Sequence, residues 1–205
     1  MPARLTSEEA LREVYPKPSG GALGKQLDFI DRHCRRFIEL SPFLCIGSSR
    51  PDGLADVSPR GGEPGFVHVL DDRRLALPDR PGNNRLDTLT NIAHAPAVGL
   101  LFFLPGFEEM LRVNGFAATS LAPDLMARFT LEGKPPRSVL LVEVREVYLH
   151  CTKALKRSDL WNPENHVPRD ALPSFGEMLR DQMKLDVAPA LIDTALEDDA
   201  KKNLY

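Results

Sequence analysis

The feature that most constrains the fold is a series of short apolar segments, between residues 43 and 149, that are joined by turn sequences. Pro51-Asp52-Gly53, the charged run 71–74 and Pro105-Gly106 are turn signals between such segments. Strands joined by short turns pair as antiparallel hairpins, and this pattern disfavours a parallel sheet built with crossover helices. Residues 97–103 are almost wholly apolar, so we expect that strand to be buried on both faces.

The strand pattern predicts a mainly β fold with some α-helix. We expect about six or seven strands, at residues 43–48, 55–58, 65–70, 74–77, 97–103, 111–119 and 139–149. A closed or partly closed antiparallel barrel fits these strands best, because closure protects strand edges and buries residues 97–103.

Helical periodicity flanks the strand region on both sides. Thr6 and Glu9 have the spacing of a capping box, so a first helix is expected to end near Tyr15, and residues 18–24 are expected to be a connector. A second helix is expected to begin at Leu27 and to stop at Pro42. Residues 175–183 and 191–196 each place apolar side chains on one helix face, which predicts two C-terminal helices packing on the barrel or on a second subunit.

The stretch 77–91 combines a strand end, a tight turn and a helix start. Asn84 has Asp87 three residues on and is expected to cap a helix whose apolar stripe begins at Leu86. Arg80 and Arg85 flank the same turn. Free helix-start amides and two guanidinium groups together predict a phosphate cradle, with both arginines pointing inward. The alternative is that Asn84 only caps the helix and the arginines are solvated.

Two further clusters carry chemistry of interest. Ser58-Pro59-Arg60 places a proline inside a strand, which requires an edge or a bulge, and a cation just before two glycines. Lys153, Arg157 and Trp161 place two cations and the sole tryptophan close together. Each cluster can also be an ordinary solvated surface.

Composition and motifs exclude several classes of function. The net charge of −3 gives no electrostatic case for nucleic acid, and no run of transmembrane length is present. The three cysteines are scattered and the N-terminus lacks an apolar core of signal-peptide length, so we expect reduced thiols, a cytoplasmic protein and no metal site. The common nucleotide-binding and hydrolase motifs are absent. No acid, base or nucleophile is singled out, so no catalytic residue is assigned.

A family resemblance joins these features. The segments ADVSPRGG at 55–62, FVHVLDDRRLALPDRPGNNRLDTLTNI at 66–92, LLFFLPG at 100–106 and LRVNGFA at 111–117 resemble the pyridoxamine 5′-phosphate oxidase-like flavoproteins. The chain is particularly similar to a bacterial subgroup with an aspartate-arginine-proline-glycine-asparagine stretch. The resemblance implies an FMN-binding antiparallel split β-barrel with flanking helices. It implies one domain over residues 1–205, with N-terminal helices at 1–41, the barrel at 42–150 and a C-terminal helical extension at 151–205.

The resemblance also implies where FMN would bind. It puts the FMN phosphate on Arg80, Asn83, Asn84 and Arg85. It puts the isoalloxazine ring along Val57, Ser58, Pro59 and Arg60, with Pro78 and Asp79 close by. It implies a homodimer with two FMN sites at the interface, which the neighbouring subunit completes through Arg112, Lys153, Arg157 and Trp161.

Departures from the family pattern argue against the oxidation of pyridoxamine phosphate as the activity of this chain. True pyridoxamine phosphate oxidases carry serine-arginine-lysine at the phosphate turn, where this chain has Asn83-Asn84-Arg85, and a glutamine where it has Met110. Their C-terminal arginine-leucine-histidine segment is also missing here. We therefore expect an FMN-dependent oxidoreductase of a different small-molecule substrate. The alternatives are a non-catalytic flavin-binding or regulatory protein, and a split barrel that uses haem or a deazaflavin.

Overall fold

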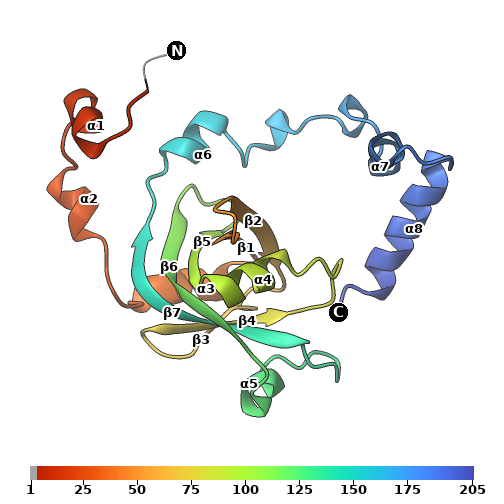
Figure 1. The fold of residues 1–205 in the computed structure, drawn as a ribbon, viewed down its shortest axis with the longest axis horizontal. Coiled ribbons are helices and arrows are strands. Elements are labelled where there is room, and N and C mark those ends of the chain that lie inside the picture. The colour runs from red at the N-terminus through yellow and green to blue at the C-terminus, as the bar shows by residue number, and fades with distance from the viewer. Residues whose placement is uncertain (1–3) are drawn as a thin grey trace.

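Seven antiparallel strands form one sheet in the computed structural model, which describes residues 4–205 (Figure 1). Their order across the sheet is β2-β1-β5-β6-β7-β4-β3. The strands are β1 (Phe43–Ser49), β2 (Ala55–Gly61), β3 (His68–Val69), β4 (Arg74–Asp79), β5 (Ala97–Phe103), β6 (Met110–Ser120) and β7 (Ser138–Leu149). The prediction of a mainly β, antiparallel fold is confirmed.

The sheet curls but stays open, with β2 and β3 as its two edges. Of the expected closed or partly closed barrel, full closure is not found, and the predicted split barrel with flanking helices is confirmed as an open one. The strand expected at 65–70 is only two residues long, His68–Val69, which leaves little backbone for a further ladder. Pro59 lies in the edge strand β2, opposite Cys45 of β1, where its missing N–H group costs no ladder hydrogen bond.

The main core lies on one face of the sheet, and Ala76, Phe129 and Val139 form a second, smaller buried cluster. In β5 the side chains of Val98, Leu100 and Phe102 are buried, whereas Leu101 and Phe103 on the other face are only half-buried. The expected burial of this strand on both faces is therefore wrong. Antiparallel sheets commonly pack one face on the core and leave the other partly open to water.

The N-terminal helices begin later than the sequence pattern predicts. In α1 (Glu8–Val14) the side chain of Ser7, not Thr6, accepts the capping bond from the Ala10 amide, and the short α2 (Gly20–Gly24) occupies the expected connector. The next helix, α3 (Arg32–Leu40), is capped by Asp31 and buries Cys34 and Ile38. Residue Leu27 lies before it, because its backbone exchanges hydrogen bonds of 3.0 and 2.8 Å with Val147.

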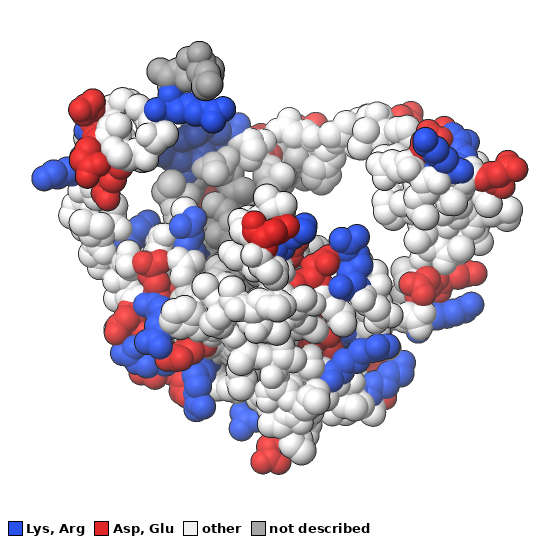
Figure 2. Space-filling model, viewed as in Figure 1, with Lys and Arg blue, Asp and Glu red and all other residues white. Residues whose placement is uncertain are grey.

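The remaining helices are α4 (Asp87–His94), α5 (Pro123–Ala127), α6 (Lys153–Ser158), α7 (Phe175–Met183) and α8 (Pro189–Lys202). Residues 151–205, the C-terminal arm, leave the end of β7 and arch around one side of the barrel (Figure 1). Open space separates much of this arm from the barrel in the space-filling view (Figure 2). Within the arm α7 packs on α8, and the Gly176 amide donates to Asp193 Oδ1 at 2.7 Å.

The end of the arm returns to the barrel. The Lys134 Nζ atom donates to the main-chain oxygen of Tyr205 at 3.0 Å, and the Tyr205 ring lies 5.6 Å from the guanidinium carbon of Arg80. Among residues 4–205, none of the helices has the length and apolar character needed to cross a membrane.

Candidate functional site

A hollow of about 540 Å³ lies between the edge strand β2, the end of β4 and the turn that precedes α4. Ten of the predicted site residues line it: Val57, Ser58, Pro59, Arg60, Pro78, Asp79, Arg80, Asn83, Asn84 and Arg85. Two segments that the sequence predicts to be adjacent are thus brought together by the fold. We call this hollow the main pocket.

A buried polar side chain, Asn91, links helix α4 to β1 and β2. The Nδ2 atom of Asn91 donates to Ser48 Oγ at 3.0 Å and to Asp56 Oδ2 at 3.3 Å. Asn91 is only 3% exposed, so these bonds form where water does not compete. They keep α4 beside β2, and Asp56 is itself part of the pocket wall.

The turn before α4 has an unusual backbone. Asn84 and Leu86 adopt left-handed conformations with φ values of 57° and 60°. The Oδ1 atom of Asn83 accepts a bond from the Arg85 amide at 3.1 Å, which closes a local turn. Left-handed backbone is uncommon outside glycine and asparagine, and such residues concentrate at functional sites.

The expected capping role of Asn84 is wrong. Helix α4 begins at Asp87, and its N-cap residue Leu86 makes no side-chain capping bond. The Oδ1 atom of Asn84 instead accepts from Arg137 Nη1 at 3.4 Å. Leu86 is 54% exposed and lines the main pocket, so the apolar stripe of α4 does not begin there, whereas Ile92 is buried in the core.

The helix start still offers backbone donors. The bond from the Thr90 amide to the Leu86 carbonyl, at 2.8 Å, is the first of the α-helical pattern. The N–H groups that precede it in the first turn have no intrahelical acceptor, and the helix dipole makes that end favourable for an anion. The pocket wall includes this turn from Pro81 to Asp87.

Four guanidinium groups and three carboxylates line the main pocket: Arg60, Arg80, Arg85, Arg137, Asp56, Asp79 and Asp87. The Nε atom of Arg85 pairs with Asp87 Oδ2 at 2.8 Å near the solvent. Arg60 Nη1 donates to Ser58 Oγ at 2.7 Å and to the Pro59 carbonyl at 2.8 Å. The pocket can therefore bind an anion by rearranging an existing ion pair at its rim.

Arg80 stands between the main pocket and a second hollow of about 210 Å³. Its Nη2 atom donates to the Phe129 carbonyl at 2.8 Å, and its guanidinium faces the Tyr205 ring. His68 stacks on Phe129 with ring centroids 4.1 Å apart and lines the second hollow. The expectation that Arg80 points inward to a phosphate does not match this contact with Phe129.

Two polar groups on the pocket floor were not found from the sequence. Arg137 immediately precedes β7, and Ser138 is the first residue of β7 and pairs directly with Asp79 of β4. Burial raises the pKa of Asp79, while the nearby positive charges of Arg60 and Arg137 act to lower it. In sequence these two residues follow Pro135-Pro136 and carry no motif, so only strand pairing reveals them.

The residues present fit a phosphorylated, planar cofactor such as FMN. Cationic side chains and helix-start amides gather at the turn, which suits a phosphate. Ser138 Oγ is buried and, within residues 4–205, makes no hydrogen bond to any protein atom, which is a position for a ligand contact. The described residues hold no cluster of three histidine, cysteine, aspartate or glutamate side chains that could bind a metal ion.

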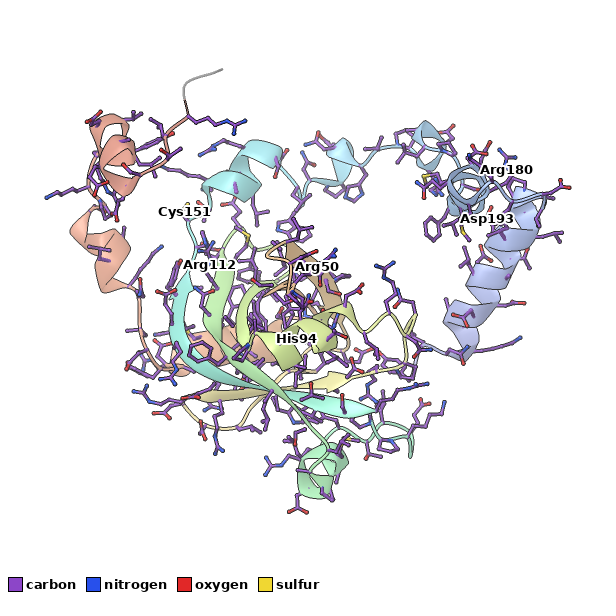
Figure 3. The ribbon with its side chains drawn as sticks, in the orientation of Figure 1. Arg50, His94, Arg112, Cys151, Arg180 and Asp193 are labelled. Carbon is purple, nitrogen blue, oxygen red and sulfur yellow. The ribbon has the colours of Figure 1, made fainter. Side chains whose placement is uncertain are left out.

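The four residues expected from a neighbouring subunit lie outside the main pocket of this chain: Arg112, Lys153, Arg157 and Trp161. Arg112 Nη1 donates to the Tyr148 hydroxyl at 2.9 Å, and Trp161 Nε1 donates to the Phe107 carbonyl at 2.8 Å. Figure 3 shows Arg112 and Cys151 on the β6 and β7 side of the sheet. Their contribution to a partner's pocket stays a prediction.

The fold and the site together define a split-barrel protein with a cationic pocket beside the first helix that follows β4. The family model described as pyridoxamine 5′-phosphate oxidase matches residues 30–151, and the chain belongs to that family. The matched segment contains every strand of the sheet and the whole main pocket. A comparison with curated proteins finds no match.

Solved structures show similar chain traces at low identity. HupZ of Group A Streptococcus is 13% identical, with a TM-score of 0.49, and the match covers 58% of this chain and 93% of HupZ. A Clostridium acetobutylicum protein related to general stress protein 26 is 10% identical, with a TM-score of 0.44 and coverage of 58% and 85%. An F420 reductase is 19% identical, with a TM-score of 0.42 and coverage of 57% and 94%. At these identities the likeness says nothing about ligand or activity.

Proposed function

We propose that this protein binds FMN in the main pocket and acts as an FMN-dependent oxidoreductase on a small-molecule substrate. The observation that carries the proposal is the 540 Å³ pocket, which joins a cationic turn at a helix start to the strands β2 and β4. Membership of the pyridoxamine 5′-phosphate oxidase family supports it, because members of this family commonly bind flavin. Bound FMN would supply the hydride-transfer chemistry.

The turn before α4 is proposed to hold the FMN phosphate. Arg85 and the amides of the first helical turn would bind its oxygens, and Arg137 would add positive charge while it positions Asn84. Arg85 would exchange its bond to Asp87 for one to the phosphate. Because the Arg85–Asp87 pair is exposed to solvent, breaking it costs little free energy.

The strand β2 is proposed to lie along the isoalloxazine ring. Arg60 would place a positive charge near the ring and favour negative charge that develops on it. Its two hydrogen bonds to Ser58 and Pro59 would hold the guanidinium in that position. No side chain of the pocket is assigned as an acid or a base.

Oxidation of pyridoxamine phosphate is not part of the proposal. The glutamine of true oxidases is Met110 here, and Met110 is 7% exposed and has no strong hydrogen-bonding group. The phosphate turn also lacks the usual serine and lysine. A different substrate is therefore proposed.

We also propose that the functional unit is a cytoplasmic homodimer with FMN at the interface. Support comes from apolar side chains that the single chain leaves exposed beside the pocket and on the arm, such as Val57 at 67% and Val167 at 75%. In such a dimer Arg112, Lys153, Arg157 and Trp161 would reach the partner's cofactor. Light scattering of the purified protein measures its molar mass. A monomer that binds one FMN per chain would contradict the proposed dimer.

An absorption spectrum of the protein, as purified and after incubation with FMN, tests the cofactor. We expect the two-band spectrum of oxidised flavin and loss of its longer-wavelength band when NADH or NADPH is added without oxygen. A bound flavin that no donor reduces would indicate a non-catalytic flavin-binding protein. A Soret band or a deazaflavin spectrum would indicate another cofactor, and a colourless protein that takes up no FMN would overturn the proposal.

Substituting Arg85→Ala tests the phosphate position. If its charge-assisted contact is worth about 1.5–3 kcal/mol, FMN affinity falls roughly ten- to a hundredfold. Riboflavin, which lacks the phosphate, is the matched control ligand, and its affinity is expected to stay unchanged. An equal loss of affinity for FMN and for riboflavin would show that the phosphate does not bind at Arg85.

A further inference from the structure

The hydroxyl of Ser138 is an exception to the rule that buried polar groups have partners. Ser138 is 6% exposed and is the first residue of β7. Its Oγ atom is buried and has no hydrogen-bond partner among the described residues, although Ser138 lines the main pocket. A buried hydroxyl in this state lowers the stability of the protein without its ligand, and a ligand atom in the pocket can satisfy it.

Asp79 lies directly opposite Ser138 in the ladder between β4 and β7. Directly opposed residues of an antiparallel pair project to the same face of the sheet. Both residues line the main pocket, and their side chains, a carboxylate acceptor and a buried hydroxyl without a partner, project to the same face of the sheet. Asp79 is half-buried, which disfavours its charged form unless a donor approaches it.

The chemistry of Asp79 and Ser138 restricts which part of a ligand can bind next to them. A phosphate would be repelled by the Asp79 carboxylate, whereas an N–H group would be bound by it. The imide edge of a flavin ring presents an N–H group between two carbonyl oxygens, which matches an acceptor beside a hydroxyl donor. Haem offers no such N–H edge, so the pair favours a flavin or a deazaflavin ring.

We propose that Asp79 and Ser138 recognise the imide edge of the isoalloxazine ring, with Asp79 accepting from N3–H and Ser138 donating to a neighbouring carbonyl. This inference rests on the proposed binding of FMN in the same pocket. It orients the cofactor, because the imide edge then lies on the floor between β4 and β7. The phosphate end then lies at the turn before α4.

The first test is Ser138→Ala, measured by urea unfolding without cofactor and by FMN fluorescence titration. Loss of an unpartnered hydroxyl leaves the stability of the FMN-free protein unchanged or higher, while loss of one ligand bond weakens FMN binding roughly fivefold. The matched control is Ser41→Ala, because Ser41 is also buried but its hydroxyl has carbonyl acceptors within reach, those of Phe103 at 2.6 Å and Phe43 at 2.9 Å. This control is expected to lose stability and to keep its FMN affinity.

Two results for Ser138→Ala would overturn the proposal. One is an FMN affinity equal to that of the unsubstituted protein. The other is a loss of stability like that of Ser41→Ala, because it would show a structural partner for the hydroxyl. Circular dichroism of both variants checks that each is folded before titration.

The second test uses FMN methylated at N3, which removes the proposed donor and leaves the phosphate intact. The unsubstituted protein is expected to bind this analogue at least roughly tenfold more weakly than FMN, and Asp79→Ala is expected to bind both ligands with similar affinity. Equal binding of FMN and the analogue by the unsubstituted protein would overturn the imide assignment alone. A protein that binds neither ligand would overturn both this inference and the proposed function.

Discussion

Arg137 Nη1 donates to Asn84 Oδ1 across 3.4 Å and joins the start of β7 to the left-handed turn before α4. The Arg137 amide also donates to the Asp79 carbonyl at 2.9 Å, so the residue is tied to the end of β4. These two bonds connect the turn that lines the pocket with its floor. The turn before α4 is therefore tied to the end of β4 by a residue far from it in sequence.

Arg137→Ala is expected to weaken FMN binding roughly tenfold, about 1.4 kcal/mol, because it removes a positive charge and releases Asn84. Arg145→Ala is the matched control, since Arg145 is an exposed arginine in β7, the strand that follows Arg137, and pairs with Glu143 at 2.8 Å. Fluorescence titration of both variants measures the difference. Equal affinities in the two variants would contradict a role for Arg137 in the pocket.

Asp87→Asn is expected to strengthen FMN binding a few fold. The substitution removes the carboxylate that holds Arg85 at 2.8 Å and removes negative charge beside the proposed phosphate. It also removes an acidic side chain from the first turn of α4, which is expected to cost about 0.5 kcal/mol of stability. Titration and urea unfolding together check these opposite effects, and weaker FMN binding would show that Asp87 helps to position Arg85.

Leu86→Asn is expected to raise the unfolding free energy by about 0.5–1 kcal/mol. The left-handed φ of 60° at Leu86 costs a leucine about 1 kcal/mol or more, whereas asparagine tolerates it better. Little apolar burial is lost, because Leu86 is 54% exposed. Leu121→Asn, at a site 70% exposed and without positive φ, is the control and should show no such gain.

The stability of the FMN-free protein is expected to fall as the pH drops through about 6.5. Burial, with the nearby charge of Arg128, lowers the pKa of His68 in the folded protein. A histidine with a lowered folded pKa stabilises the fold above its unfolded pKa, and that contribution is lost as the pH falls toward the folded value. Urea unfolding at pH 7.5 and pH 5 is expected to show a smaller loss for His68→Gln, and equal losses would exclude His68 as the cause.

Local sequence patterns predicted much of the sheet. The bounds of β5 match the predicted 97–103, β1 and β7 differ from their predicted bounds by one residue at one end, and β6 differs by one residue at each end. Hydrophobic periodicity and turn preferences depend on residues that are close in sequence, so a short segment is enough to predict them. The same patterns failed at Leu27, which continues the apolar spacing of α3 but pairs with Val147 instead.

Ten pocket residues follow from the family resemblance, because they lie in two contiguous motifs at 57–60 and 78–85. Arg137 and Ser138 do not, because they reach the pocket only through the pairing of β4 with β7. Asn84 shows the same limit, since its residue type is typical of a helix cap but its side chain bonds to Arg137.

The sequence by itself determined the strands, the turns between them and the cationic turn before α4, because backbone propensity and hydrophobic period depend on near neighbours. Only the tertiary structure decided that the sheet stays open, that Arg137 holds Asn84 and that Ser138 lies unpartnered beside Asp79. Those facts depend on which strands pair and in what register, and pairing between distant segments is decided by burial in the whole fold.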